Sequence, residues 1–533
     1  MASAFVNLMR LGKAGLVLAQ HGVRLVPDGL RLPAPLKAAL LLTWPIRVLS
    51  APFRWGMKPE TRIASALSTL GPSYIKLGQF LATRADIIGP RLAGELSLLQ
   101  DRLPPFSQQE ARRSVTDALG GRLEDHFTEF GPPVAAASIA QVHKATAIEN
   151  GETRTLAVKI LRPGVERRFK ADLDSYYFAA RQIERFHAPS RRLKPVAVVD
   201  NLKRTTELEL DLRLEAAAIS EMADNIKDDV PRSDESAGFR VPTVDWRRTQ
   251  KRVLTLEWID GIPISDHARI KTAGHDPKRL GLTVLRSFLT HAMRDGFFHA
   301  DMHQGNLFVQ ADGTIVAIDF GIMGRIDRRA RQWLAEILYG LITGNYRRVA
   351  EIHFEAQYVP SHHSVDEFAT ALRAVGEPMR GKPVSELSVG QMLDGLFAIT
   401  RDFDMQTQPH LLLLQKTMVM VEGIATSLDP AINMWDAAAP FVREWIRDEL
   451  GPEAALAERI RTDTETLLRV PALVRRLEER FPPRGGAPEP PPLPRIELMW
   501  ERRRRAATPL IGYGLAAVAG AALVWAGTAV GWL

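Results

Sequence analysis

The stretch HADMHQGNLFVQADGTIVAIDFG, residues 299–321, places three polar side chains around a predicted hairpin. Asp301 and Asn306 are five residues apart, and Asp319 follows Asn306 by thirteen. The apolar runs LFV and TIVAI flank the turn ADG, a pattern that predicts a β-hairpin. Such a hairpin brings Asp319 back beside Asn306. Their oxygen atoms suit Mg²⁺, which takes a few protein oxygens together with the phosphates of a nucleotide.

This spacing is that of a protein-kinase catalytic loop followed by D-F-G. In that reading Asn306 and Asp319 are metal ligands, and Asp301 acts on the reacting group. The alternative is an ordinary hairpin with solvated acidic residues. The agreement between the three polar positions and the strand-turn-strand pattern favours the nucleotide-metal site.

A kinase also needs a lysine on a strand and a carboxylate partner on a helix. The run RTLAVKILRP, residues 154–163, is rich in β-branched residues and carries Lys159. The segment 207–226 consists of strong helix formers and offers Glu209, Asp211 and Glu215. We expect Glu215 to form the ion pair with Lys159.

The stretch before the lysine strand departs from the kinase pattern. A kinase carries a glycine-rich phosphate loop there, whereas this chain has Ala135, Ala136, Ala137 and Ser138. Glycine allows positive φ and a close approach of the backbone to phosphate, and alanine restricts both. We therefore expect the loop to hold the nucleotide in a less mobile geometry.

Together these motifs resemble the UbiB family of atypical kinases, also called AarF-domain kinases. The resemblance covers roughly residues 70–330 and rests on AAAS, LAVK, ELD, HADMHQGN, DFG and the upstream segment YIKLGQFLATRADIIGP, residues 74–90. That segment contains the family's K-x-G-Q signature as Lys76, Gly78 and Gln79. The resemblance implies a regulatory helix that folds over the nucleotide cleft, with Lys76 and Gln79 close to Glu209 and Asp211. This helix would partly fill the place of a peptide substrate.

The sequence after Gly321 also argues against peptide phosphorylation. A peptide kinase has an activation loop that ends in A-P-E, but helical periodicity returns almost at once and no such motif occurs. Ala300 stands where the catalytic loop usually has arginine. Hydrolysis of ATP, or transfer to a small or lipid-like acceptor, fits these departures better.

The end of the chain predicts a membrane anchor. Residues 509–533 contain no charged side chain and are long enough to cross a bilayer core of roughly 30 Å. The preceding run ERRRR, residues 501–505, places the catalytic body in the cytoplasm by the positive-inside rule. Gly527 and Gly531 form a G-x-x-x-G pair, through which a homodimer could pack.

The beginning of the chain is basic. Residues 1–60 hold eight Lys/Arg and two Asp/Glu, and the apolar region 36–55 is interrupted by Lys37, Pro45 and Arg47. We expect either an amphipathic segment on the inner leaflet or a helix packed on the kinase lobes.

The chain has no cysteine, which excludes disulfides and iron–sulfur clusters and fits a reducing compartment.

We therefore expect an α+β, protein-kinase-like fold of two lobes, with an N-terminal helical extension and a C-terminal transmembrane helix. The link LTLEWIDGIPI, residues 254–264, should offer backbone groups to adenine at Glu257, Trp258 and Ile259. The expected parts are a basic amphipathic segment (1–60), a helical K-x-G-Q extension (61–130), a small lobe (131–258), a helical large lobe (259–450), a helical tail with a proline-rich linker (451–508) and the transmembrane helix (509–533).

The predicted function is that of an Mg²⁺- and ATP-dependent atypical kinase or ATPase at the inner membrane. The resemblance implies a role in ubiquinone biosynthesis, with membrane lipids, isoprenoid quinone precursors and other proteins of that pathway as partners. The net charge of +7 is assigned to the membrane surface and not to nucleic acid. The main alternative is a pseudokinase scaffold or lipid chaperone whose nucleotide pocket only switches conformation.

A third hypothesis, direct hydroxylation of the quinone ring, requires flavin, haem or iron. The chain has only one E-x-x-H pair, Glu184 with His187, where a di-iron helix bundle needs two. His299 and His303 are expected to orient the backbone near the catalytic loop.

Overall fold

The computed structural model divides into two compact units. It describes residues 4–23, 58–82, 88, 90–99, 103–186, 191, 194–227, 238–377, 399, 402–405, 409–432, 441, 444–445 and 447. Unit 1 takes Met1–Ala217 and Thr243–Trp258, and unit 2 takes Ala218–Pro242 and the described chain from Ile259 onward. Each unit contains both helices and a sheet, which confirms the α+β class.

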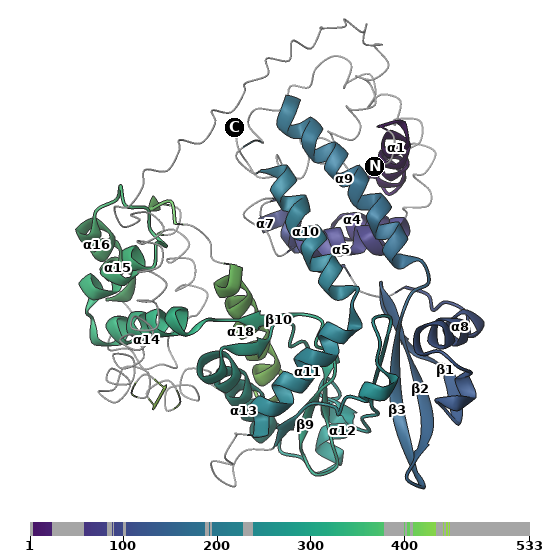
Figure 1. The fold of residues 1–533 in the computed structure, drawn as a ribbon. Helices are drawn as coiled ribbons and strands as arrows, with labels where there is room; N and C mark the ends of the chain where they lie inside the picture. Colours follow the sequence, from purple (N-terminus) through teal and green to yellow (C-terminus); the bar gives the residue numbers. More distant parts are fainter. Residues whose placement is uncertain are drawn as a thin grey trace, which may run out of the picture. The chain divides into compact units, whose positions relative to one another are not determined.

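Unit 1 combines a helical group with an antiparallel sheet (Figure 1). Its helices are α1 (Ala4–Gln20), α4 (Arg62–Leu70), α5 (Pro72–Ala82), α7 (Pro90–Ser97), α8 (Gln108–Leu119), α9 (Val165–Phe186), α10 (Pro195–Glu209) and the first turns of α11 (Leu212–Lys227). Its strands are β1 (Glu129–Ala136), β2 (Ala140–Glu149), β3 (Glu152–Leu161) and β5 (Val253–Glu257). Helices α1, α4, α5, α7, α9 and α10 contribute to one apolar core.

The sheet of unit 1 has the order β1-β2-β3-β5 with antiparallel neighbours. Along β3, Leu156, Val158 and Ile160 are buried in the core that also contains Ala111 and Val115 of α8. Because side chains alternate across a strand, Lys159 lies on the opposite face from that core. A capping box formed by Ser107 and Glu110 begins α8.

The segment expected as one helix over residues 207–226 is broken in two. α10 ends at Glu209 and α11 begins at Leu212. The Asp211 side chain accepts a hydrogen bond from the Arg213 N–H at 3.2 Å, and aspartate that bonds to the backbone in this way favours a helix start over a helix interior. Three helices, α9, α10 and α11, lie between β3 and residue 258.

Unit 2 contains two small sheets and a set of helices. Its strands are β4 (Phe239–Arg240), β6 (Ile262–Pro263), β7 (Phe297–His299), β8 (Leu307–Val309), β9 (Ile315–Ala317) and β10 (Met323–Arg325), in the orders β4-β9-β8-β6 and β10-β7. Its helices are the rest of α11, α12 (His267–Thr272), α13 (Pro277–Leu289), the π-helix η6 (Thr290–Asp295), α14 (Arg328–Thr343), α15 (Tyr346–Glu355), α16 (Val365–Gly376) and α18 (Pro409–Leu428). Short 3₁₀ turns complete the two units: η2 (Pro59–Thr61), η3 (Leu123–Asp125), η5 (Trp246–Arg248) and η7 (Gln304–Asn306).

Helix α18 packs closely on α13. A Cβ atom built at Gly281 of α13 would lie 3.3 Å from the Ala425 Cα and 2.6 Å from the Ile432 Cδ1. Glycine is therefore needed for the two backbones to approach this closely.

The expected return to helix after the D-F-G motif is confirmed at α14, which Asp327 caps, although β10 comes first.

Two predictions about the membrane fall on segments that the structure does not describe. The predicted span 509–533 and the apolar region 36–55 both lie outside the described residues. Among the helices that are described, none has the length and apolarity needed to cross a bilayer.

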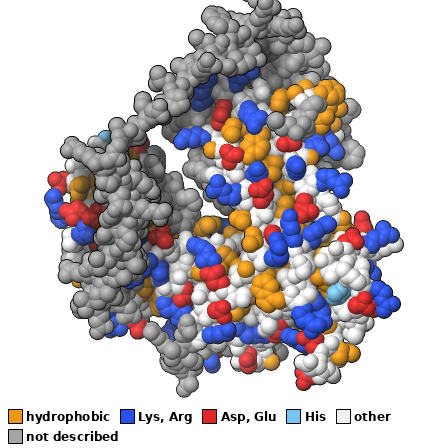
Figure 2. All heavy atoms as spheres, in the orientation of Figure 1, with side chains coloured by type: hydrophobic (Ala, Val, Ile, Leu, Met, Phe, Trp, Pro, Cys, Tyr) orange, Lys and Arg blue, Asp and Glu red, His pale blue; other side chains and the backbone are white. Residues whose placement is uncertain are grey.

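On the face shown in Figure 2, Lys and Arg side chains are interspersed with Asp and Glu, so the described residues form no continuous basic stripe there.

The glycine of the K-x-G-Q segment has a packing role that can be tested. A Cβ atom at Gly78 of α5 would lie 2.7 Å from the Leu67 Cδ1, whereas one at Gly94 of α7 would meet nothing within 4 Å. We predict that Gly78→Ala lowers the free energy of unfolding by about 1–3 kcal/mol through overpacking. Gly94→Ala should be neutral or raise it by up to about 1 kcal/mol through helix propensity. Urea denaturation of the two variants measures the difference, and equal midpoints would contradict the prediction.

Candidate active site

The predicted site residues form two sets, one in each unit. Unit 2 holds Asp301, Asn306 and Asp319, and unit 1 holds the lysines and carboxylates expected to bind phosphate and to regulate the site. Each set is built by local structure within its own unit.

The predicted hairpin is confirmed as β8 and β9. The strands pair antiparallel with Leu307 opposite Ala317, and the Ile318 N–H donates to the Asn306 carbonyl at 3.0 Å. This register places Asn306 and Asp319 next to each other at the open end of the hairpin. The Asn306 Nδ2 donates to the Asp301 carbonyl at 3.2 Å, which leaves its Oδ1 as the atom able to bind a cation. Asp319 Oδ1 accepts from the Gly321 N–H at 3.1 Å.

A buried histidine fixes the backbone at Asp301. His299 Nδ1 accepts a hydrogen bond from the Asp301 N–H at 3.1 Å, and its ring packs edge-on against Phe320 with centroids 5.0 Å apart. Burial lowers the pKa of His299, while the negative charges of Asp319 and Asp301 act in the opposite direction. A neutral ring that accepts at Nδ1 carries its proton on Nε2. His303 Nδ1 likewise accepts from the Gly305 N–H at 3.0 Å, so both histidines orient backbone as expected.

Helix α18 brings a lysine to this loop that the sequence analysis did not single out. Lys416 Nζ lies 3.7 Å from Asp301 Oδ1, and the loop is also tied to α18 by a 2.9 Å hydrogen bond from Gln304 Nε2 to Ser427 Oγ. Lys416 is the single Lys or Arg residue of α18 and lies in the apolar run LLLLQKTMVMV. A lone cation in such a run was the available signal.

The expected ion pair of unit 1 is present. Lys159 Nζ lies 2.7 and 2.9 Å from the two Glu215 carboxylate oxygens, and the pair is largely buried, with side-chain exposures of 17% and 7%. Glu215 lies in the first turn of α11, where the helix dipole favours a negative charge. The strand lysine therefore has a fixed position before any phosphate is bound.

The alanine-rich loop closes the β1–β2 hairpin. Ala135 and Ala136 end β1, and Ala137 and the buried Ser138 form the turn. The Ala137 N–H donates to the Ala140 carbonyl at 2.8 Å. The Arg162 guanidinium donates twice to the Ala137 carbonyl, at 3.1 and 2.9 Å. A turn held at both its N–H and its carbonyl has little freedom to move, and the expectation that this loop holds the nucleotide in a less mobile geometry stays a prediction.

Of the two carboxylates expected near the K-x-G-Q helix, Glu209 forms an ion pair with it and Asp211 pairs with another residue. Lys76 Nζ lies 2.7 Å from Glu209 Oε2, and both side chains are largely buried. Asp211 instead forms a bidentate pair with Arg213, at 2.9 and 2.6 Å, and this pair lowers the pKa of the Asp211 carboxyl. Gln79, the remaining polar member of the motif, lies one turn further along α5.

The backbone proposed to meet adenine is partly used within unit 1. The Glu257 N–H donates to the Thr243 carbonyl at 2.9 Å, and the Trp258 N–H donates to the Thr155 carbonyl at 3.1 Å. Ile259 begins the next part of unit 2. An adenine contact at Glu257 or Trp258 would therefore use a carbonyl oxygen.

Comparisons with known proteins define the class. The ABC1 atypical kinase-like domain matches residues 98–353, and the UbiB helical domain matches residues 372–433. The fold is therefore that of the kinase-like α+β class.

Individual relatives give the family. The chain is 40% identical to the probable protein kinase UbiB of Aeromonas hydrophila over 445 residues, which cover 81% of this chain and 80% of the relative. It is 38% identical to the protein of the same name from Pseudomonas putida over 497 residues, 90% of each chain. The chain belongs to the UbiB family of atypical kinases. Among solved structures, the Rv3197–erythromycin complex from Mycobacterium tuberculosis matches 75% of this chain and 96% of its own, at 24% identity and a TM-score of 0.45.

The buried ion pair generates a prediction about stability. We predict that Lys159→Met destabilises the protein by about 3–5 kcal/mol, because the Glu215 carboxylate would remain buried without its partner. The matched control is Lys203→Met, since Lys203 and Glu207 lie 3.8 Å apart on the surface of α10 and such exposed pairs contribute about 0–1 kcal/mol. Chemical denaturation measures both losses. Equal losses in the two variants would mean that the Lys159 pair does not hold unit 1 together.

Proposed function

We propose that the protein is a membrane-bound, Mg²⁺- and ATP-dependent phosphotransferase or ATPase that supports ubiquinone biosynthesis. The observation that carries this proposal is the convergence of Asn306 and Asp319 at one end of a hairpin, next to the Asp301–Lys416 pair. Two oxygen ligands beside a carboxylate and a cation suit the binding of a nucleotide's metal and the orientation of an attacking oxygen.

Each residue has a defined task in this scheme. Mg²⁺ bound to ATP would neutralise charge on the phosphates, and Asn306 and Asp319 would hold it. Asp301 orients the hydroxyl or water that attacks. Lys416, drawn to the Asp301 carboxylate, supplies positive charge where the transferred phosphoryl group gathers negative charge. Lys159, held by Glu215, binds the phosphate tail, as the corresponding lysine does in kinases.

Features of both units support a non-peptide acceptor. Lys76 is engaged by Glu209 in unit 1, which favours a K-x-G-Q helix held in one place over a mobile lid. In unit 2 the chain passes from Asp319 through β10 to α14 with only eight residues between Asp319 and Arg328. That length has no room for a long peptide-docking activation loop. A lipid-like quinone precursor or water therefore remains as the acceptor.

The decisive experiment measures phosphate release and nucleotide binding in parallel. Asp319→Asn should lose Mg²⁺-dependent turnover by at least about 100-fold, because metal-held phosphate chemistry depends on that carboxylate. Lys416→Gln should lower kcat more than it weakens nucleotide binding. Anionic liposomes and a quinone-precursor analogue are included, since either could be needed for activity.

The control comes from the same hairpin. Asp312 lies in the β8–β9 turn, where it bonds to the Thr314 N–H and hydroxyl at 2.9 Å each. Asp312→Asn should keep wild-type turnover because it leaves the turn and the proposed ligands intact. Turnover in Asp319→Asn equal to that of Asp312→Asn would refute the proposed metal site.

A second candidate is a nucleotide-binding scaffold that does not turn over. The clamped turn at Ala137 favours it, because Arg162 fixes a loop that moves in many kinases. The scaffold predicts that the wild-type protein binds Mg²⁺-ATP and that no lipid or phenolic activator elicits phosphate release. Turnover that Asp301→Asn abolishes would exclude it.

The proposed anchor is residues 509–533, with the basic run 501–505 at the inner leaflet. We predict that the full chain floats with liposomes through a density gradient, whereas a chain that ends at residue 500 is found mainly with the soluble fraction. Replacing the arginines of the run by glutamine should reduce the preference for anionic over neutral lipid. Equal flotation of the full and shortened chains would place the membrane contact elsewhere.

A further inference from the structure

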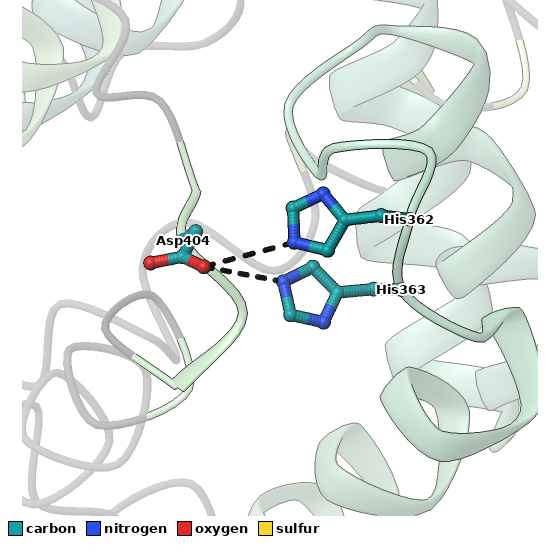
Figure 3. Close-up of side chains that lie close together, drawn as sticks. All are labelled: His362, His363 and Asp404. Atoms are coloured by element: carbon teal, nitrogen blue, oxygen red, sulfur yellow. Dashed lines mark ion pairs between the residues drawn. The ribbon is translucent and has the colours of Figure 1, made fainter.

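Two histidines and an aspartate that are not among the candidate active-site residues converge in unit 2 (Figure 3). His362 and His363 follow one another in the turn between α15 and α16, and Asp404 lies in the segment before α18. Asp404 Oδ2 is 3.8 Å from His362 Nε2 and 3.5 Å from His363 Nε2. The three candidate ligand atoms all lie within 4.8 Å of one another.

These separations are close to what a single metal ion requires. Metal–ligand distances of about 2.0–2.2 Å in tetrahedral geometry put neighbouring ligand atoms about 3.3–3.6 Å apart. In Figure 3 both imidazole rings turn the same edge toward the Asp404 carboxylate. Small rotations of exposed side chains would close the remaining gap.

The shielded Nε2 atom of His363 gives a second, independent indication. His363 Nε2 is shielded from solvent and has no hydrogen-bond partner in the part of the chain that the structure describes. Its 3.5 Å distance to Asp404 Oδ2 is too long for a good hydrogen bond. A buried polar atom without a partner costs free energy, and a metal ion between the ring and the carboxylate would satisfy it.

The two rings are also close enough to favour a shared cation. Their centroids are 4.1 Å apart with the planes tilted by 39°. Two imidazolium ions at this distance would repel each other, whereas two neutral rings can bind one divalent ion through their Nε2 atoms.

The backbone at Asp404 is anchored by the residues on either side. Phe403 and Met405 pack into the apolar core of α14, α15 and α16, with the Phe403 ring 4.9 Å from that of Phe368 and 5.2 Å from that of His363. Asp404, between these two anchors, has the left-handed backbone conformation with φ 47°. Aspartate tolerates this conformation at a modest cost, and here it accompanies a carboxylate that lies beside two histidines.

We propose that His362, His363 and Asp404 bind one divalent transition-metal ion of the zinc class, with water at the remaining position. Two imidazole nitrogens favour Zn²⁺ or Co²⁺ over Mg²⁺, which prefers oxygen ligands. His362 and Asp404 are largely exposed, with side-chain exposures of 65% and 72%, so water and metal can reach the site. The ion would link the Phe403–Met405 segment to the turn that carries His362 and His363. The segment belongs to the UbiB helical domain match, and the turn lies between the two matched domains. This proposal does not depend on the proposed enzymatic activity.

The test titrates the full-length, tag-free and chelator-treated protein with Co²⁺ and then Zn²⁺. The visible absorption of Co²⁺ in low-coordination nitrogen–oxygen sites reports binding, and Zn²⁺ should displace it at one ion per chain. His362→Gln, His363→Gln and Asp404→Asn should each weaken binding at least tenfold, since each removes one of three ligands. Zn²⁺ should raise the thermal midpoint of the wild type and not that of the triple variant. An excess of Mg²⁺ should leave the bound Co²⁺ in place.

The matched control is His275→Gln, which alters a histidine of unit 2 that faces Gly313 near the β8–β9 turn. It should bind Co²⁺ as the wild type does. The metal-free thermal midpoints of all variants show whether each is folded. Wild-type Co²⁺ affinity in the triple variant, absence of Co²⁺ binding in the wild type, or displacement by Mg²⁺ at equal concentration would each overturn the proposal.

Discussion

The candidate active site of unit 2 depends on the register of the β8–β9 hairpin. The strands are only three residues each, and the Ile318 N–H that bonds to the Asn306 carbonyl extends the pairing to the site itself. Side chains alternate along a strand, so a slip of one residue would turn Asp319 to the opposite face. Leu307, Val309, Ile315 and Ala317 are fully buried, and this buried set prevents the slip. A small apolar core thus fixes the position of two polar groups.

The predicted phosphate-binding residues of unit 1 are held in position by charge. Lys159 and Glu215 come from a strand and a helix start that are 56 residues apart in sequence. Removing either partner would leave the other charge largely buried and unpaired. The pair therefore holds the start of α11 against the sheet. It also fixes the position of the Lys159 ammonium group. Arg162 and the Ala137 carbonyl make a comparable contact at the adjacent turn. Unit 1 is therefore preorganised, and the alanines limit how far its loop can depart from that arrangement.

The sequence predicted those features that depend on local patterns. The hairpin follows from alternating apolar residues and an Asp-Gly turn, and the ion pair follows from the order of a strand lysine and a helix carboxylate. The break between Glu209 and Leu212 was missed, because helix propensity does not count the hydrogen bond that Asp211 makes to the next turn. Lys416 was missed for another reason. Its partner Asp301 lies more than a hundred residues earlier, and only the packing of α18 on α13 brings them together. The Gly78 contact with Leu67 is likewise a product of tertiary packing.

The close contact between Gly281 of α13 and Ala425 of α18 limits which changes of length this part of the chain can accept. Because Ala425 packs directly against Gly281, the rotation of α18 about its own axis is fixed at Ala425. Each helical residue advances the direction of the side chain by about 100°. Deleting Thr417, Glu422 or Gly423 would keep every apolar residue of the helix and yet turn the ammonium group away from Asp301. Length variation in this family should therefore be tolerated before Pro409 or after Leu428, and selected against among the eight residues between Lys416 and Ala425.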